Sequence, residues 1–184
     1  LGQGHTRMEI WEVLKHKGVL KFLAVFTISY IILYLMYALF LKLSSSPDVF
    51  TKLVSKQSVY ILNQLNYKTT SEINASYSGI KLFVNRKHIA GIAEGCNALS
   101  IMILFVSFIL AFAKSVKKTF FFCLLGLVFI HIMNILRIVI LIISIYNYPE
   151  YSEPLHSIVF PGIIYCAVFL LWMLWVKSFQ KTTP

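Results

Sequence analysis

Residues 92–113 read IAEGCNALSIMILFVSFILAFA, and the rest of the chain is organised around this stretch. It carries a carboxylate at Glu94 and a thiol at Cys96, where polar sequence gives way to an apolar run long enough to enter a bilayer. A cysteine is a good nucleophile when nearby positive charge favours its thiolate. This placement would hold a nucleophile at a membrane surface, beside a substrate embedded in lipid.

The composition excludes an ordinary soluble domain. Of the 184 residues, 58% are hydrophobic and only 13% are charged, and several uncharged stretches run for about 20 residues. The net charge of +10 would suit a nucleic-acid partner, but the Lys and Arg residues flank the apolar runs, which is a signal of membrane topology. We therefore expect a polytopic protein whose partner is the lipid bilayer, and no nucleic acid.

Four apolar runs predict about four transmembrane helices, near residues 22–41, 96–113, 120–145 and 157–176. Basic residues flank one end of every run, whereas the connection 146–156 has two Glu and no Lys or Arg. The positive-inside rule then places both termini in the cytoplasm and the loop 42–93 outside, although long translocated loops obey the rule weakly. We expect an all-α polytopic protein of the inner (cytoplasmic) membrane, active on its extracytoplasmic side.

The ends of the chain and the outer loop add detail. Residues 1–7, LGQGHTR, differ in composition from the segment that begins at Met8, so we interpret them as an expression remnant and residues 8–184 as one membrane-embedded domain. In the loop, Ser46-Pro47-Asp48 resembles a helix start with Pro at the first helical position, which predicts an amphipathic helix. Its expected apolar face consists of Phe50, Leu53, Val54, Ile61, Leu62 and Leu65. This helix would lie on the membrane surface or pack on the other helices.

A small hairpin is predicted between that helix and the second span. Ile80, Leu82 and Val84 alternate with polar neighbours, which is the pattern of a half-buried strand. The turn residues Asn85-Arg86-Lys87 come next, and the chain can then run back toward Gly91.

Three polar side chains from different predicted helices fall in the outer half of the bilayer. Arg137 lies inside the third span, about eight residues and so about 12 Å short of its outer end. A permanent charge at that depth is costly and normally faces a protein interior or a water-filled cavity. Asn134 precedes Arg137 by three residues and shares its helix face. His156 lies at the outer start of the fourth span. Cys96, Arg137 and His156 therefore form a candidate site.

Each of these residues also has a purely structural interpretation. A lone cysteine often only packs, an interfacial histidine is usually solvated, and Arg137 could lock two helices through an ion pair with Glu94. His131 extends the polar face, but an interior histidine is often satisfied by a structural partner. Cys123 lies about 30 Å from Cys96 in depth, too far for a disulfide. Metal-ligand spacings are absent from the sequence, and we expect neither metal nor cofactor.

These residues carry a resemblance to a known family. Glu94-Gly95-Cys96-Asn97, Asn134-Ile135-Leu136-Arg137 and His156 resemble the motifs of the exosortase/archaeosortase family. The compact layout is similar to its short XrtF-type members, and the resemblance covers about residues 92–176. Ala98 departs from the pattern, because a Gly often stands there in this family.

The resemblance implies a membrane cysteine protease of the transpeptidase kind. Such an enzyme cuts exported proteins at a C-terminal sorting signal, which consists of a short motif, a transmembrane helix and a basic tail, and passes them to an acceptor amine or lipid. The resemblance implies Cys96 as nucleophile, Arg137 as the essential cation and His156 as the proton-transfer residue. Supporting or substrate-binding roles are expected for Glu94, Asn97 and Asn134.

The chemistry of acyl transfer agrees with these roles. Attack by a thiolate on a peptide carbonyl gives a thioester, and Arg137 could stabilise the thiolate or the oxyanion, a term often worth about 3 kcal/mol per donor. His156 would protonate the leaving amine and then activate the incoming nucleophile.

Other functional classes stay open. The chain could be a non-catalytic scaffold or assembly factor in which Glu94 and Arg137 merely pair. A small transporter would need a polar pathway through both membrane halves, whereas these polar residues gather in one. A hydrolytic intramembrane protease differs only in that water resolves the thioester. The sequence names neither the substrate motif nor the acceptor.

Overall fold

A computed structural model describes residues 17–74, 78–113 and 115–180 of the chain. In chain order the elements are α2 (Lys17–Leu43), α3 (Val49–Gln64), β1 (Thr69–Ile73), β2 (Gly79–Val84), β3 (Lys87–Ala93), α4 (Leu99–Ala111), α5 (Val116–Asn147), the 3₁₀ helix η1 (Pro149–Tyr151), α6 (Ser152–Pro154), the π-helical turn η2 (Leu155–Val159) and α7 (Phe160–Gln180). The interpretation of residues 1–7 as an expression remnant lies outside the described residues.

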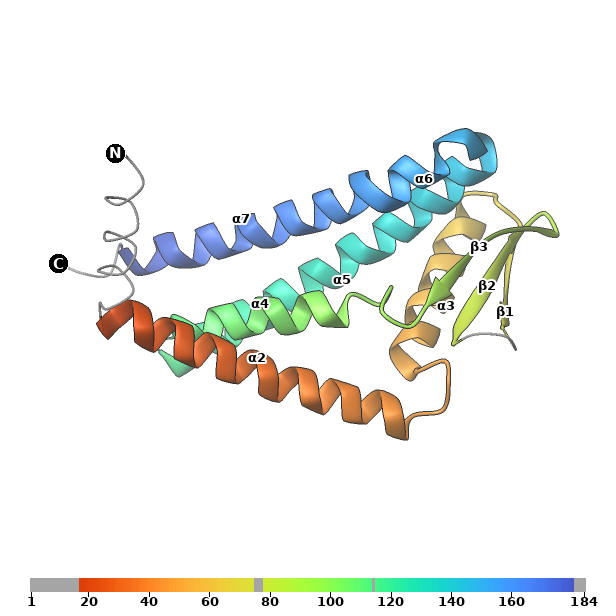
Figure 1. Cartoon of the computed structure of the whole chain (residues 1–184). Helices are drawn as coiled ribbons and strands as arrows, with labels where there is room; N and C mark the ends of the chain where they lie inside the picture. The colour runs from red at the N-terminus through yellow and green to blue at the C-terminus, as the bar shows by residue number, and fades with distance from the viewer. Residues whose placement is uncertain (1–16, 75–77, 114, 181–184) are drawn as a thin grey trace, which may run out of the picture.

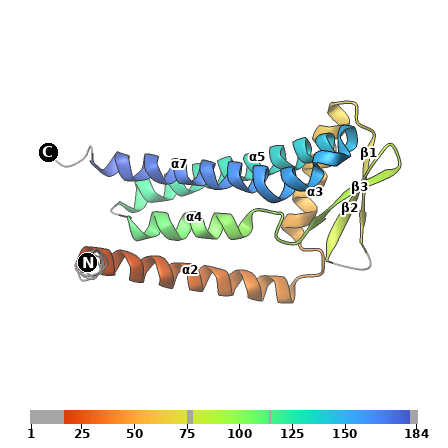
Figure 2. The same ribbon diagram turned by 45° about the horizontal axis from the view of Figure 1, so that its top comes forward.

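The helices α2, α4, α5 and α7 run alongside one another, and α3 and the sheet lie across one end of them (Figure 1). The helix α4 packs against α2, α5 and α7, and a second view shows it between α2 and the α5–α7 pair (Figure 2). The start of α2 and the end of α7 both lie at the end of the bundle opposite the sheet (Figure 1).

The described chain is mostly helical, and three of its helical segments are long and apolar enough to cross a membrane. They are Lys17–Leu43, Val116–Asn147 and Pro149–Ser178. The predicted second span is shorter, because α4 has 13 residues and rises about 20 Å against about 30 Å of hydrocarbon. The structure therefore supports a polytopic α-helical membrane protein but does not confirm four spans.

The helix α3 starts where the sequence predicts, with two corrections. Asp48 is the N-cap, since its side chain accepts from the N–H groups of Phe50 and Thr51, so Pro47 precedes the cap and does not occupy the first helical position. The buried face also differs from the expected stripe and consists of Thr51, Val54, Ser55, Ser58 and Leu62. Phe50, Leu53 and Leu65 are exposed. The helix packs on α5 and the sheet through a face with three hydroxyl groups, which a search for apolar periodicity does not detect.

The predicted hairpin is present as β2 and β3, which pair antiparallel. Asn85 and Arg86 both have positive φ, as a tight two-residue turn between such strands requires. A third strand, β1, pairs with β2 and gives the order β1-β2-β3. We did not predict β1, because its sequence TTSEI is polar and all but its first residue are exposed.

Two hydrophobic cores hold these elements together. The sheet core joins α3, the strands and the second half of α5, and consists of Val54, Leu62, Ile80, Leu82, Val84, Ile92, Ile135, Ile138, Val139 and Ile142. The bundle core joins α4, α5 and α7 and consists of Ala98, Phe105, Ile109, Ile130, Val168 and Trp175. The turn from β3 to α4 lies where the two cores meet, because Cys96 packs on the first and Ala98 belongs to the second.

Candidate active site

Cys96 lies in a turn that connects β3 to α4. Its N–H donates to the Ala93 carbonyl at 3.0 Å, and Gly95 has a φ of +99, a value that L side chains rarely adopt. The sequence predicts Cys96 at the start of a helix, but α4 begins three residues later, at Leu99. The reason is Ala98, whose left-handed backbone, at a φ of 62, separates the turn from the helix. The thiol thus belongs to a shaped turn and is partly buried.

Asn97 connects this turn to the beginning of α3. Its Oδ1 accepts from the Leu99 N–H at 3.1 Å, a local bond typical of asparagine in turns. Its Nδ2 donates to Thr51 Oγ1 at 3.3 Å and approaches Asp48 Oδ2 at 3.5 Å. Asn97, Asp48 and Thr51 are all buried. The amide therefore binds two segments that are 46 to 49 residues apart in the sequence.

Glu94 makes a second connection between the same segments. Its Oε1 accepts from the Asp48 backbone N–H at 3.0 Å. The Tyr37 side chain, from α2, lies beside Asn97 and near the Asp48 and Glu94 carboxylates. The buried Tyr37 hydroxyl has no hydrogen-bond partner in the described part of the chain. The helices α2 and α3 and the turn thus meet around one polar cluster.

Asn134 fixes the turn to α5. It is fully buried, and its Nδ2 donates to the Cys96 carbonyl at 2.9 Å. Its Oδ1 is buried and has no partner among the described residues, and the same is true of Arg137 Nε, three residues further along the helix. A native structure normally satisfies such groups. An acceptor and a donor without partners therefore lie on one helix face, beside the cysteine turn.

Arg137 forms no ion pair with Glu94 or with another described residue; Glu94 binds the Asp48 backbone instead. Arg137 lies about 28 Å along α5 from Lys118, and the helix continues beyond it to Asn147 within the sheet core.

His156 lies in η2 and is exposed. It shares no hydrogen bond with the other predicted site residues. The structure brings four of those residues together through the contacts described above: Glu94, Cys96, Asn97 and Asn134. His131, by contrast, is satisfied, since its Nε2 lies 2.9 Å from Gln57 Oε1 on α3. The structural interpretation of His131 is thereby confirmed.

Asp48, Thr51 and Tyr37 belong to this cluster, and we did not predict them as site residues. Asp48 is the only aspartate in the sequence, and it follows the first span. That is a usable signal, but the helix start predicted at Ser46-Pro47-Asp48 accounts for the residue without a role in a site. Thr51 and Tyr37 carry no such signal, because only the folded chain brings α2 and α3 to the turn. Within the described residues, no group of three or more His, Cys, Asp or Glu side chains is placed to hold a metal ion.

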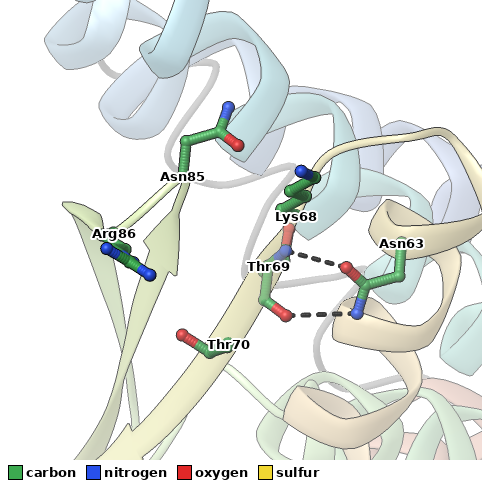
Figure 3. A pocket seen from close by; sticks show the side chains of 6 residues that line it. All are labelled: Asn63, Lys68, Thr69, Thr70, Asn85 and Arg86. Carbon is green, nitrogen blue, oxygen red and sulfur yellow. Dashed lines mark hydrogen bonds between the residues drawn. The ribbon is translucent and has the colours of Figure 1, made fainter.

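A cavity of about 570 Å³ lies away from this cluster, between the end of α3 and the strands (Figure 3). Asn63 closes one wall by pairing with the Thr69 backbone at 2.8 and 3.1 Å. The remaining lining residues are Lys68, Thr70, Asn85 and Arg86. None of the predicted site residues lines it.

Comparison with known proteins assigns the chain to a family. Residues 16–177 match the family model described as transmembrane exosortase, whereas no curated protein and no solved structure matches. Members of that family are cysteine-dependent transpeptidases that act in a membrane on exported proteins with C-terminal sorting signals. Because the match covers far more than half of the sequence, this chain belongs to the transmembrane exosortase family.

Proposed function

We propose that this protein cleaves the C-terminal sorting signal of exported proteins with Cys96 as its nucleophile, and transfers them through a thioester to an acceptor amine or lipid. The observation that carries the proposal is the bond from Asn134 Nδ2 to the Cys96 carbonyl. It holds the thiol's turn against the helix face on which Arg137 Nε and Asn134 Oδ1 have no partner among the described residues. Buried groups of this kind are the ones that a bound peptide can satisfy.

The reaction has two steps. In the first, Cys96 Sγ attacks the scissile carbonyl as a thiolate, the carbon–nitrogen bond breaks, and the leaving amine takes up a proton. In the second, the acceptor loses a proton, attacks the thioester carbonyl and releases the thiolate. Water in place of the acceptor would make the same site a protease.

Arg137 is assigned to charge stabilisation in both steps. Its guanidinium carries a permanent positive charge and several donors, and the unpartnered Nε is available to an oxyanion or to the thiolate. A donor to the oxyanion of acyl transfer is worth about 3 kcal/mol. The scaffold alternative assigns Arg137 to an ion pair with Glu94, and the described residues form no such pair.

His156 is assigned to proton transfer. It is the one histidine on the connection between α5 and α7, and its exposed ring is open to a substrate. Catalytic contacts of this kind often tighten only when the substrate binds. Glu94, Asn97 and Asn134 are positioning residues, because each binds the turn or the segment that it packs on.

The setting of the reaction follows from the charges. Lys17, Lys21, Lys117, Lys118 and Lys177 lie near the helix ends opposite the sheet. The positive-inside rule turns that end to the cytoplasm and the site to the extracytoplasmic side of the inner membrane. The compact layout supports membership of the short XrtF type.

The test uses the native cell. Membrane-anchored exported proteins are followed by electrophoretic mobility in cells with Cys96→Ser and, as matched controls, Cys123→Ser and Cys166→Ser. Only Cys96→Ser should stop processing, because a hydroxyl is far harder to ionise than a thiol in the same place. Normal processing in Cys96→Ser cells would favour the scaffold.

A further inference from the structure

The strand β3 is an edge of the sheet and leads directly to the nucleophile. The strand order ends at β3, and no described strand pairs with its outer side. Figure 1 shows β3 passing straight into the loop before α4, and that loop contains Cys96. An unpaired edge is a template on which an extended chain can add as a further strand.

The ladder shows which groups of β3 face outward. In an antiparallel pair, residues that bond to the partner alternate with residues whose N–H and C=O point away. The Glu94 N–H donates to the Ser78 carbonyl at 3.1 Å, and the register makes Ile92 the next bonded residue of β3. Gly91 and Ala93 therefore turn their main-chain groups to the outer edge. Gly91 is exposed, so this part of the edge is accessible.

One of these outward groups is already used, since the Ala93 carbonyl accepts from the Cys96 N–H at 3.0 Å. The other three groups have no partner among the residues that the structure describes: the N–H and C=O of Gly91 and the N–H of Ala93. A peptide strand can satisfy all three, because in a parallel pair the N–H and C=O of one residue bond to two residues of the neighbour that are two apart.

We propose that the segment of an exported substrate immediately before the cleaved bond binds as an added strand along the outer edge of β3. This inference rests on the proposed function. The substrate's transmembrane helix follows the cleaved bond, so the preceding segment runs from outside toward the membrane. The strand β3 also runs toward Cys96 from its outer end, so the added strand is parallel to β3. At a rise of about 3.3 Å per residue, the bonded substrate residues lie about three to six positions before the cleaved bond.

Proline at residue 91 tests the main-chain contact. The Gly91 N–H points away from β2, and proline is tolerated on an edge strand at such a position. Gly91→Pro removes the N–H that would donate to the substrate, and its ring obstructs the approach of the substrate strand to β3. No hydrogen bond inside the sheet is lost. Processing of an exported protein that depends on Cys96 should fall about tenfold or more. Alkylation of Cys96 by iodoacetamide should keep its rate, because the nucleophile is not touched.

Two controls isolate the N–H group and the edge. Gly91→Ala keeps the N–H and should process the exported protein faster than Gly91→Pro does. Ser71→Pro makes the same change on the other edge of the sheet. The Asn74 N–H donates to the Gly79 carbonyl, so by alternation along β1 the main-chain groups of Ser71 point away from β2. The Ser71→Pro variant should process the exported protein normally. Equal processing by Gly91→Pro and Ser71→Pro would overturn the proposal.

Disulfide trapping gives a second measurement that does not depend on folding of the proline variant. In a Cys96→Ala background, Gly91→Cys is paired with single cysteines placed along the reporter before its cleavage site. An added strand predicts crosslinks at every second reporter position and none from Ser71→Cys. Crosslinks without this alternation would overturn the strand but leave the proposed function intact. A cell in which no processing depends on Cys96 would overturn both.

Discussion

Replacing Asn134 with leucine should separate the activity of this protein from its stability. The buried Asn134 Nδ2 binds the Cys96 carbonyl at 2.9 Å, while its Oδ1 has no partner among the described residues. Leucine leaves the Cys96 carbonyl without a donor, which costs about 1–3 kcal/mol, and removes an unsatisfied acceptor, which offsets a similar amount. The free energy of unfolding should therefore change by no more than about 2 kcal/mol.

The activity should change more. If the bond contributes about 2 kcal/mol to holding the Cys96 turn, its loss lowers the equilibrium constant for the ordered turn about 30-fold, which is the upper limit for the fall in processing. Thermal unfolding and processing are measured on the same membranes. The matched control is Asn147→Ala, which removes an exposed asparagine of α5 that donates to Tyr67 and to the Ile143 carbonyl. Wild-type processing by Asn134→Leu would refute the role of the bond.

Two further predictions concern packing and charge. Gly126→Ala should lower the free energy of unfolding by about 1–3 kcal/mol, and with it the thermal midpoint, because the new Cβ collides with the fully buried Phe105 ring. In the control Gly162→Ala the new Cβ meets nothing within 4 Å, so the thermal midpoint should stay unchanged. Arg137→Ala should stop or strongly slow processing, because acyl transfer loses an oxyanion donor worth about 3 kcal/mol; processing at the wild-type rate would contradict the role assigned to Arg137.

The helices were predictable where hydrophobicity alone determines them. The three long spans α2, α5 and the segment that ends in α7 follow from apolar runs that only a bilayer or a buried core accommodates. The start of α4 was not predictable, because the left-handed conformation of Ala98 leaves no trace in residue type. The strand β1 was not predictable for a related reason: its pairing with β2 makes it a strand, and its polar sequence does not indicate one.

The candidate site was predictable only in part. The motif residues of the turn and of α5 could be identified from their order along the chain, and the structure joins Cys96 to Asn134. The contacts of Asn97 with Asp48 and Thr51 depend on how α3 folds back across α5. Pairs that far apart in a sequence carry no local pattern, so Asp48 and Thr51 could only be found in the folded chain.

The central claim is a covalent intermediate on Cys96, and mass spectrometry of the trapped enzyme tests it most directly. Membranes that hold substrate are quenched with acid, digested and searched for the peptide that contains Cys96. We predict a modification of that peptide by an exported protein cut at its C-terminal signal, which hydroxylamine releases as a thioester and which Cys96→Ala abolishes. Continued processing in Cys96→Ala membranes, or an adduct on Cys123 or Cys166, would contradict the account.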